Sequence, residues 1–138
     1  MQNVINNVQQ NNQPQQLIRG GIYLVDLGVG KGSLQGKVRP CVLISNRACN
    51  TYSPVLHFCP VSSITSKSKL PTHIGLSKNN SGLLRDSIVL CEQTQLVTKD
   101  SIGRKVGQCS EEDLQRVSKG IAIQFGLVEV RNNVAYAN

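Results

Sequence analysis

Aromatic residues are scarce in the 138-residue sequence, which has no Trp, three Tyr and two Phe. No apolar run reaches the roughly 18 to 20 residues that cross a bilayer, and the N-terminus lacks the basic start and apolar stretch of a secretory signal. We therefore expect a cytoplasmic protein that does not enter a membrane. If the chain binds bases, few aromatic side chains are available for stacking on them.

Clustered metal ligands are also missing. The two His, His57 and His73, stand apart, and the eight acids are scattered along the chain. The five Cys form an odd set without a CxxC pair, so we expect reduced and mostly buried thiols. GVGKG (28–32) lies between two expected strands and opens no helix, unlike a nucleotide-binding loop. We expect no metal and no cofactor.

Acidic residues are absent from Leu27 through Arg85, although the chain carries a net charge of +7. Such segregation produces a positive field that attracts phosphate backbones, and a solvated basic surface is the simpler alternative. We predict a polyanion partner. The cations within this stretch are Lys31, Lys37, Arg39, Arg47, Lys67, Lys69, Lys78 and Arg85.

Three segments are expected along the chain. Residues 1–16 contain eleven Asn or Gln and therefore too few apolar side chains to form a core. Residues 1–18 are predicted to be a disordered leader. One ordered domain should span residues 19–131, and residues 132–138 should form a frayed tail.

The ordered segment has the pattern of a strand-rich α+β fold. Short stretches of β-type composition, separated by turn residues, predict a curled antiparallel sheet or small barrel. The expected strands are 21–27, 39–46, 53–62, 72–77, 86–93, 95–98 and 104–108, with a further strand over 127–130 and an edge or bulge at Pro60.

One helix is predicted near the C-terminus. Ser110 followed by three acids is a typical N-cap, and Gly126 can end the helix. The spacing of Leu114, Val117, Ile121 and Phe125 places all four on one face, which should pack on the sheet.

Arg39, at the start of a strand beside a Gly-rich loop, is a candidate phosphate ligand. Cleavage of RNA without a metal requires a base, an acid and a cation that stabilises the developing phosphorane, and the guanidinium fork suits the last role. The alternative is an Arg held by a buried carboxylate such as Asp26 or Asp86. His73 could act in proton transfer, whereas His57 is expected to be partly buried.

Several motifs occur in a known order: RGGIYLVDL, GSLQGKVRPCVLISN, SPVLHFCPVSSITSKSKLPTH, LRDSIVLCEQ and GIAIQFGL. In this order and spacing, over about residues 19–130, the sequence resembles the MazF/PemK toxins of type II toxin-antitoxin systems. The resemblance implies a small SH3-like barrel with a C-terminal helix, forming a homodimer. It also implies metal-independent cleavage of single-stranded mRNA to 2′,3′-cyclic phosphate and 5′-hydroxyl ends, blocked by a cognate antitoxin whose disordered tail fills the RNA groove.

The resemblance also implies roles for individual residues. Arg39 would transfer protons and stabilise the phosphate, and the Ser62 hydroxyl would bind the scissile phosphate. Leu34 stands where the family commonly has Glu, which puts the rate and the target sequence in question. The expected RNA-binding residues are Ser33, Gln35, Lys37, Lys67, Lys69, Leu70, Pro71, His73, Glu92 and Gln93.

Two other functions remain open from the sequence. The related toxin CcdB shares the barrel but poisons DNA gyrase by protein contact, because a fold alone does not fix function. A nucleic-acid-binding regulator would use only the basic face and leave RNA uncut.

Overall fold

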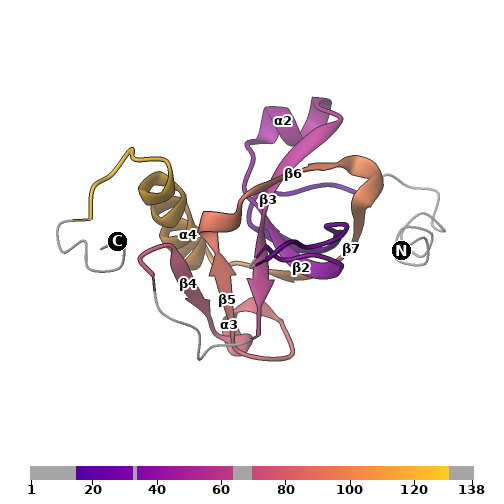
Figure 1. Ribbon diagram of the computed structural model, residues 1–138. Coiled ribbons are helices and arrows are strands. Elements are labelled where there is room, and N and C mark those ends of the chain that lie inside the picture. The colour runs from indigo at the N-terminus through magenta and orange to yellow at the C-terminus, as the bar shows by residue number, and fades with distance from the viewer. Residues whose placement is uncertain (1–14, 33, 64–69, 131–138) are drawn as a thin grey trace.

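The computed structural model describes residues 15–32, 34–63 and 70–130 of the chain. Figure 1 shows a curled sheet with one long helix at its side. The strands are β1 (Gly21–Asp26), β2 (Val38–Leu43), β3 (Val55–Ser62), β4 (His73–Leu76), β5 (Ser87–Leu90), β6 (Gln95–Thr98) and β7 (Ile102–Gln108). The helices are α2 (Arg47–Tyr52), α3 (Lys78–Ser81) and α4 (Glu111–Gln124), with 3-10 turns η1 (Cys91–Gln93) and η2 (Lys99–Ser101).

The sheet runs in the order β4-β5-β3-β2-β1-β7, and β6 also pairs with β3. Every pairing is antiparallel, so the predicted antiparallel sheet with a C-terminal helix is confirmed. Among the described residues the pairings do not close into a ring, since β4 and β7 end the path. The predicted strand over 127–130 is wrong, because these residues form bends and irregular chain, and helices α2 and α3 were not predicted.

Strand β3 is central, and one of its edges is divided between two partners. β6 pairs with the first half of β3, and β5 pairs with its last residues. Between these two pairings the chain forms the turn η1, which does not pair with β3. The His57 carbonyl accepts from Ile44 N on the β2 side. Because the backbone polar groups of successive strand residues point to opposite edges, the Pro60 nitrogen faces the other edge of β3, where η1 lies. Pro60 therefore lies at a break in the pairing rather than in an edge strand, where its missing N–H costs no ladder bond.

Neighbouring residues along the strands supply two separate cores. Ile22, Val42 and Cys59 face one cluster, against which α4 packs through Val117. The adjacent Tyr23, Leu43 and Phe58 face the other, where the rings of Tyr23 and Phe58 meet edge to face with centroids 6.3 Å apart. This alternation follows from the period of two along a strand, and it gives the sheet no wide exposed face between β1 and β3.

Helix α4 begins as predicted. The Ser110 hydroxyl accepts from Asp113 N at 3.1 Å, and Glu111, Glu112 and Asp113 occupy the first turn. Val117 is buried, but Phe125 is 61% exposed, so its predicted place on the packed face is wrong. The helix ends one residue earlier, at Gln124, and Phe125 is its C-cap.

The chain before β1 is attached to the sheet. Gln15 Nε2 donates to the Gly103 carbonyl at 3.0 Å, and Ile18 N donates to the Tyr23 hydroxyl at 3.0 Å. Residues 15–18, expected in the disordered leader, are thus held against β1 and β7. The rest of the expected leader and the expected tail, 132–138, lie outside the described residues. No helix within the described ranges is long and apolar enough to cross a membrane.

Candidate active site and its cationic cleft

Arg39 and Ser62 lie near the same end of two paired strands, Arg39 as the second residue of β2 and Ser62 as the last residue of β3. The pairs between these strands run from Leu43 with Phe58 to Cys41 with Pro60, so Arg39 and Ser62 each lie two residues beyond the last pair. The fold thus brings two residues that are 23 positions apart in the sequence to one end of the β2–β3 pair.

The Arg39 guanidinium is oriented by its own loop and not by an acid. Its Nε donates to the carbonyl oxygen of Gly36 at 2.9 Å. Asp26 accepts from Gly28 N, Asp86 accepts from Lys78 N, and in the described part of the chain neither forms an ion pair with Arg39. The alternative of an Arg held by a carboxylate is therefore contradicted. The two Nη groups find no hydrogen-bond partner within the described residues, so both remain available to a phosphate.

Ser62 ends β3 and is only 2% exposed. It pairs with Ile88 of β5, which fixes the strand at this point. Ser63, the next residue, is exposed. The loop of residues 64–69, including Lys67 and Lys69, lies outside the described residues, as does Ser33.

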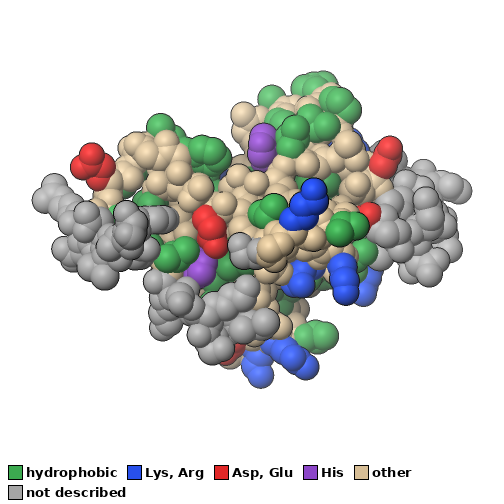
Figure 2. Space-filling view, viewed as in Figure 1, with side chains coloured by type: hydrophobic (Ala, Val, Ile, Leu, Met, Phe, Trp, Pro, Cys, Tyr) green, Lys and Arg blue, Asp and Glu red, His purple; other side chains and the backbone are tan. Residues whose placement is uncertain are grey.

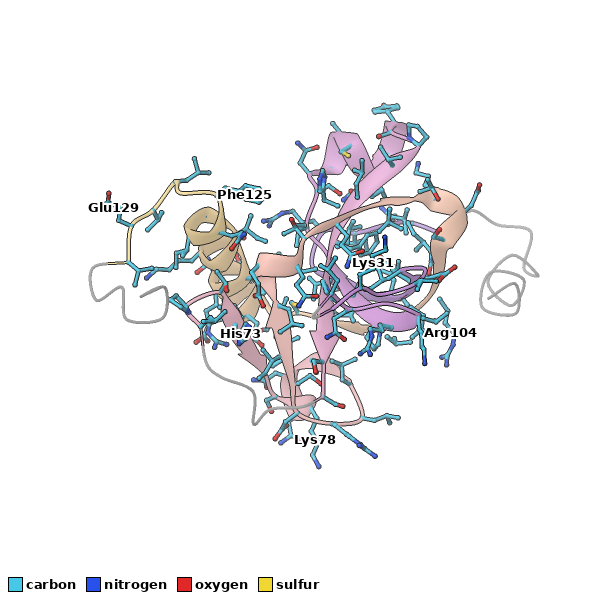
Figure 3. The ribbon with its side chains drawn as sticks, in the orientation of Figure 1. Lys31, His73, Lys78, Arg104, Phe125 and Glu129 are labelled. Atoms are coloured by element: carbon cyan, nitrogen blue, oxygen red, sulfur yellow. The ribbon has the colours of Figure 1, made fainter. Side chains whose placement is uncertain are left out.

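A cleft of about 770 Å³ opens beside Arg39. Among the described residues, no carboxylate lines this cleft, and its charged lining residues are all cations: Arg39, Arg85, Arg104 and Lys105. Figure 2 shows Lys and Arg side chains gathered on this side of the molecule, where Figure 3 places Arg104, and at the lower tip near Lys78. Arg104 and Lys105 of β7 were not predicted. They lie outside the acid-free stretch, and only the pairing of β7 with β1 brings them near β2.

The loop between β1 and β2 carries the expected residues Gln35 and Lys37. Its neck is closed by backbone bonds, from Leu27 N to the Lys37 carbonyl at 2.9 Å and from Lys37 N to the Gly28 carbonyl at 2.6 Å. Lys37 adopts a left-handed φ of 64°, and its side chain is exposed. Leu34, in place of the usual Glu, is 52% exposed.

His73 and Glu92 are brought together and largely covered. His73 Nε2 lies 2.8 Å from Glu92 Oε2, and the Thr72 hydroxyl donates to Glu92 Oε1 at 3.1 Å. The His73 side chain is only 7% exposed, and its Nδ1 has no partner among the described residues. Because the side chain is covered and Nδ1 is buried, His73 is a poor candidate for direct proton transfer to a substrate. His57, expected to be partly buried, is exposed, because its side chain faces away from the core of β3.

Pro71 lies apart from the Arg39 cleft. It lines a second cleft of about 620 Å³ with Ile74, Arg116 and Lys119, on the side of α4. Figure 3 likewise shows His73 on the α4 side of the molecule, away from Arg104. The expected groove residues therefore fall into two groups within one subunit, with Gln93 reaching from η1 toward the β1–β2 loop.

The five Cys are free thiols, four buried and Cys49 half-buried, as expected. Burial raises the pKa of Cys41, and burial raises the pKa of Cys109 to about 11. A hydrogen bond with Cys91, together with burial, raises the pKa of Cys59. Protonated thiols of this kind are poor nucleophiles and poor metal ligands. Within the described ranges, no three His, Cys, Asp or Glu side chains gather where they could hold a metal ion.

Comparison with known proteins decides the family. The model of the PemK-like, MazF-like toxin of type II toxin-antitoxin systems matches residues 18–125. The endoribonuclease MazF of Staphylococcus saprophyticus is 35% identical over 117 residues, covering 85% of this chain and 98% of that protein. The chain belongs to the PemK/MazF toxin family.

Solved structures agree on the PemK/MazF fold. MazF of Deinococcus radiodurans superposes with a TM-score of 0.69 at 18% identity, covering 82% of this chain and 99% of that one. A mycobacterial endoribonuclease, solved in complex with its cognate antitoxin, superposes with a TM-score of 0.68 at 21% identity, covering 83% and 99%. At these identities the likeness concerns the fold alone.

Proposed function

We propose that this chain is the toxin of a type II toxin-antitoxin system and a sequence-specific, metal-independent endoribonuclease. It would cut single-stranded mRNA and leave 2′,3′-cyclic phosphate and 5′-hydroxyl ends. The observation that carries the proposal is Arg39, whose two Nη groups have no hydrogen-bond partner among the described residues, near the same end of the β2–β3 pair as Ser62 and beside a cleft whose charged lining residues are all cations. Membership of the PemK/MazF family supports the same reaction.

The reaction follows from the residue types. The 2′-oxygen attacks the adjacent phosphorus as its proton leaves to a base, the bond to the 5′-oxygen breaks, and that oxygen takes up a proton. The Arg39 fork would bind the phosphate oxygens as negative charge accumulates on them, and Arg39 would take part in proton transfer. The Ser62 hydroxyl would donate to a phosphate oxygen. Metal independence rests on this pair, because neither guanidinium nor hydroxyl is a usual catalytic metal ligand.

Cations and loop residues would bind the rest of the strand. The charges of Arg85, Arg104 and Lys105 add sequence-independent and salt-sensitive affinity. The remaining RNA-binding residues are proposed from the family pattern: Ser33, Gln35, Lys37, Lys67, Lys69, Leu70, Pro71, His73, Glu92 and Gln93.

We further infer a cytoplasmic homodimer that is blocked by a cognate antitoxin. A mycobacterial structural neighbour was solved with its cognate antitoxin, which supports this kind of partner. The acidic, disordered tail of such a partner would compete with RNA for the cationic cleft. Sedimentation equilibrium at micromolar protein checks the dimer.

The decisive experiment is incubation of purified protein with a long RNA in excess EDTA, followed by mapping of the new 5′ ends. Cuts at one short motif with 5′-hydroxyl ends support the enzyme. RNA that is bound in a salt-dependent way but stays intact at micromolar protein would favour a binding module, and RNA that is neither bound nor cut would favour a CcdB-like toxin.

A further inference from the structure

The peptide of Gln35 is held on both sides by two glutamine side chains from a distant part of the chain. Gln93 Oε1 accepts from Gln35 N at 2.9 Å, and Gln95 Nε2 donates to the Gln35 carbonyl at the longer distance of 3.5 Å. The donors and acceptors of the backbone fix which end of each amide faces the loop. Gln93 must accept, and Gln95 must donate.

The next residue of the loop is the one that orients Arg39. The Gly36 carbonyl accepts from Arg39 Nε at 2.9 Å. Gly36 is also packed against Gly30, since a Cβ at Gly36 would lie 2.2 Å from Gly30 N. The Gln35–Gly36 segment is thus fixed by amides on one side and by close backbone contact on the other, and Arg39 is bound to its end.

The turn η1, which carries Gln93 and precedes Gln95, is itself held by hydrogen bonds. Cys91 N donates to the Thr72 carbonyl at 3.0 Å, and both carboxylate oxygens of Glu92 are engaged by Thr72 and His73. Because η1 leaves the ladder of β3, Gln93 projects from a turn instead of lying in a strand. Gln95 follows as the first residue of β6, paired with Phe58.

We propose that Gln93 and Gln95 are positioning residues for RNA cleavage, which clamp the β1–β2 loop at Gln35 so that Gly36 holds the Arg39 guanidinium in its working orientation. The inference rests on the proposed endoribonuclease function. It gives Gln93 a role besides RNA contact and assigns one to Gln95, which family resemblance did not single out. Orientation of a catalytic group to within fractions of an ångström governs its rate contribution.

The opposite polarity of the two bonds provides a matched test. Gln93→Glu keeps an acceptor for Gln35 N, whereas Gln93→Leu removes it. Gln95→Glu removes a donor and sets a carboxylate against the Gln35 carbonyl. The Glu variants add the same charge two residues apart, and Gln115→Glu on the exposed face of α4 controls for charge alone.

We expect Gln93→Leu and Gln95→Glu to slow single-turnover cleavage at saturating RNA about tenfold, the effect of losing one hydrogen bond of about 1.4 kcal/mol. Gln93→Glu should restore the rate lost in Gln93→Leu to within about threefold of wild type, and Gln95→Glu should bind RNA within a few fold of Gln115→Glu. Equal loss of rate in both Gln93 variants would refute the clamp. So would a Gln93→Leu protein that binds RNA weakly but cuts at the normal saturated rate, because Gln93 would then act through RNA contact.

A second readout separates the clamp from the proposed function. The ¹⁵N–¹H signal of Arg39 Nε, assigned by its loss in Arg39→Lys, reports the bond to Gly36 in the absence of RNA. It should broaden or shift in Gln93→Leu and Gln95→Glu and persist in Gln93→Glu. If the wild type fails to cut RNA, the proposed function is wrong, and this pattern still decides whether the clamp exists; an unchanged signal in all variants excludes it.

Discussion

Arg39 donates through Nε to the carbonyl oxygen of Gly36, which lies three residues earlier in the chain and 2.9 Å away. The bond uses Nε of the guanidinium, and the two Nη groups have no partner in the part of the chain that the structure describes. An Arg paired with a carboxylate would instead have to lose a partner before it could bind phosphate. The geometry therefore favours an Arg that is ready to act.

We predict that Arg39→Ala lowers the cleavage rate at least 10²- to 10³-fold, the typical effect of removing one donor to a developing oxyanion. RNA affinity should fall only a few fold, because the other cations of the cleft remain. Single-turnover cleavage and fluorescence anisotropy measure the two quantities. Arg47→Ala on α2 removes the same type of side chain outside both clefts and should cleave normally; cleavage retained in Arg39→Ala would remove Arg39 from the mechanism.

Removing the hydroxyl in Ser62→Ala should slow cleavage about tenfold or more, since a donor to the phosphate is lost. Ser62→Thr keeps the hydroxyl and should retain most of the rate. Ser62 is buried, so urea unfolding of each variant must show that the fold persists. If a folded Ser62→Ala enzyme kept its full rate, Ser62 would have no part in the reaction.

The strand pattern of this chain could be predicted from its sequence because the apolar residues alternate. Helix α4 was likewise predictable from Ser110 and its three acids. Phe125 was misplaced because a face extrapolated at helical spacing takes no account of where the helix ends. Helices α2 and α3 were missed because six-residue and four-residue helices carry too short a pattern.

The site was less predictable than the fold. No pattern in the neighbouring sequence marks Ser62, and only the pairing of β2 with β3 brings it to the same end of these strands as Arg39. Arg104 joins the cleft through the pairing of β7 with β1, which no local pattern reveals. Gln95 was missed because its role depends on a contact with the backbone of a residue 60 positions away, which has no sequence signature.

Leu34→Glu would restore the charge that the family commonly carries in the first loop. Leu34 is more than half exposed, so the change should alter the unfolding free energy by no more than about 0.5 kcal/mol. We expect RNA affinity to fall several fold through repulsion from phosphate, together with a change in cleavage rate or motif. Leu34→Gln controls for polarity without charge. Identical affinity and cut sites in the Glu variant and wild type would show that position 34 does not face the RNA.

Thiol labelling should distinguish Cys49 from the other four Cys. At pH 8 and under native conditions, iodoacetamide should modify Cys49 first, because the others are buried and the pKa values of Cys41, Cys59 and Cys109 are raised. Mass spectrometry after brief labelling measures the sites. In urea all five should react, and rapid native labelling of Cys59 would contradict the described core.

The raised thiol pKa values also predict alkaline destabilisation. A group that stays protonated in the fold stabilises it fully below its ordinary pKa near 9, and this stability is lost as pH rises toward the folded pKa, about 11 for Cys109. The unfolding free energy should therefore fall between pH 9 and 11. Cys109→Ala should flatten this dependence when urea unfolding is compared at pH 8 and 10.5, and an unchanged slope would show that Cys109 does not titrate differently in the fold.

The β1–β2 loop is fixed through backbone atoms. Its neck closes on the peptides of Gly28 and Lys37, and its far side is held at the peptide of Gln35. The side chains of Lys31 and Leu34 take no part and are exposed. Point substitutions can therefore replace the groups that this loop would offer to RNA while Arg39 stays in place. Under the proposed function, such a loop would let target preference change from lineage to lineage without passing through inactive intermediates.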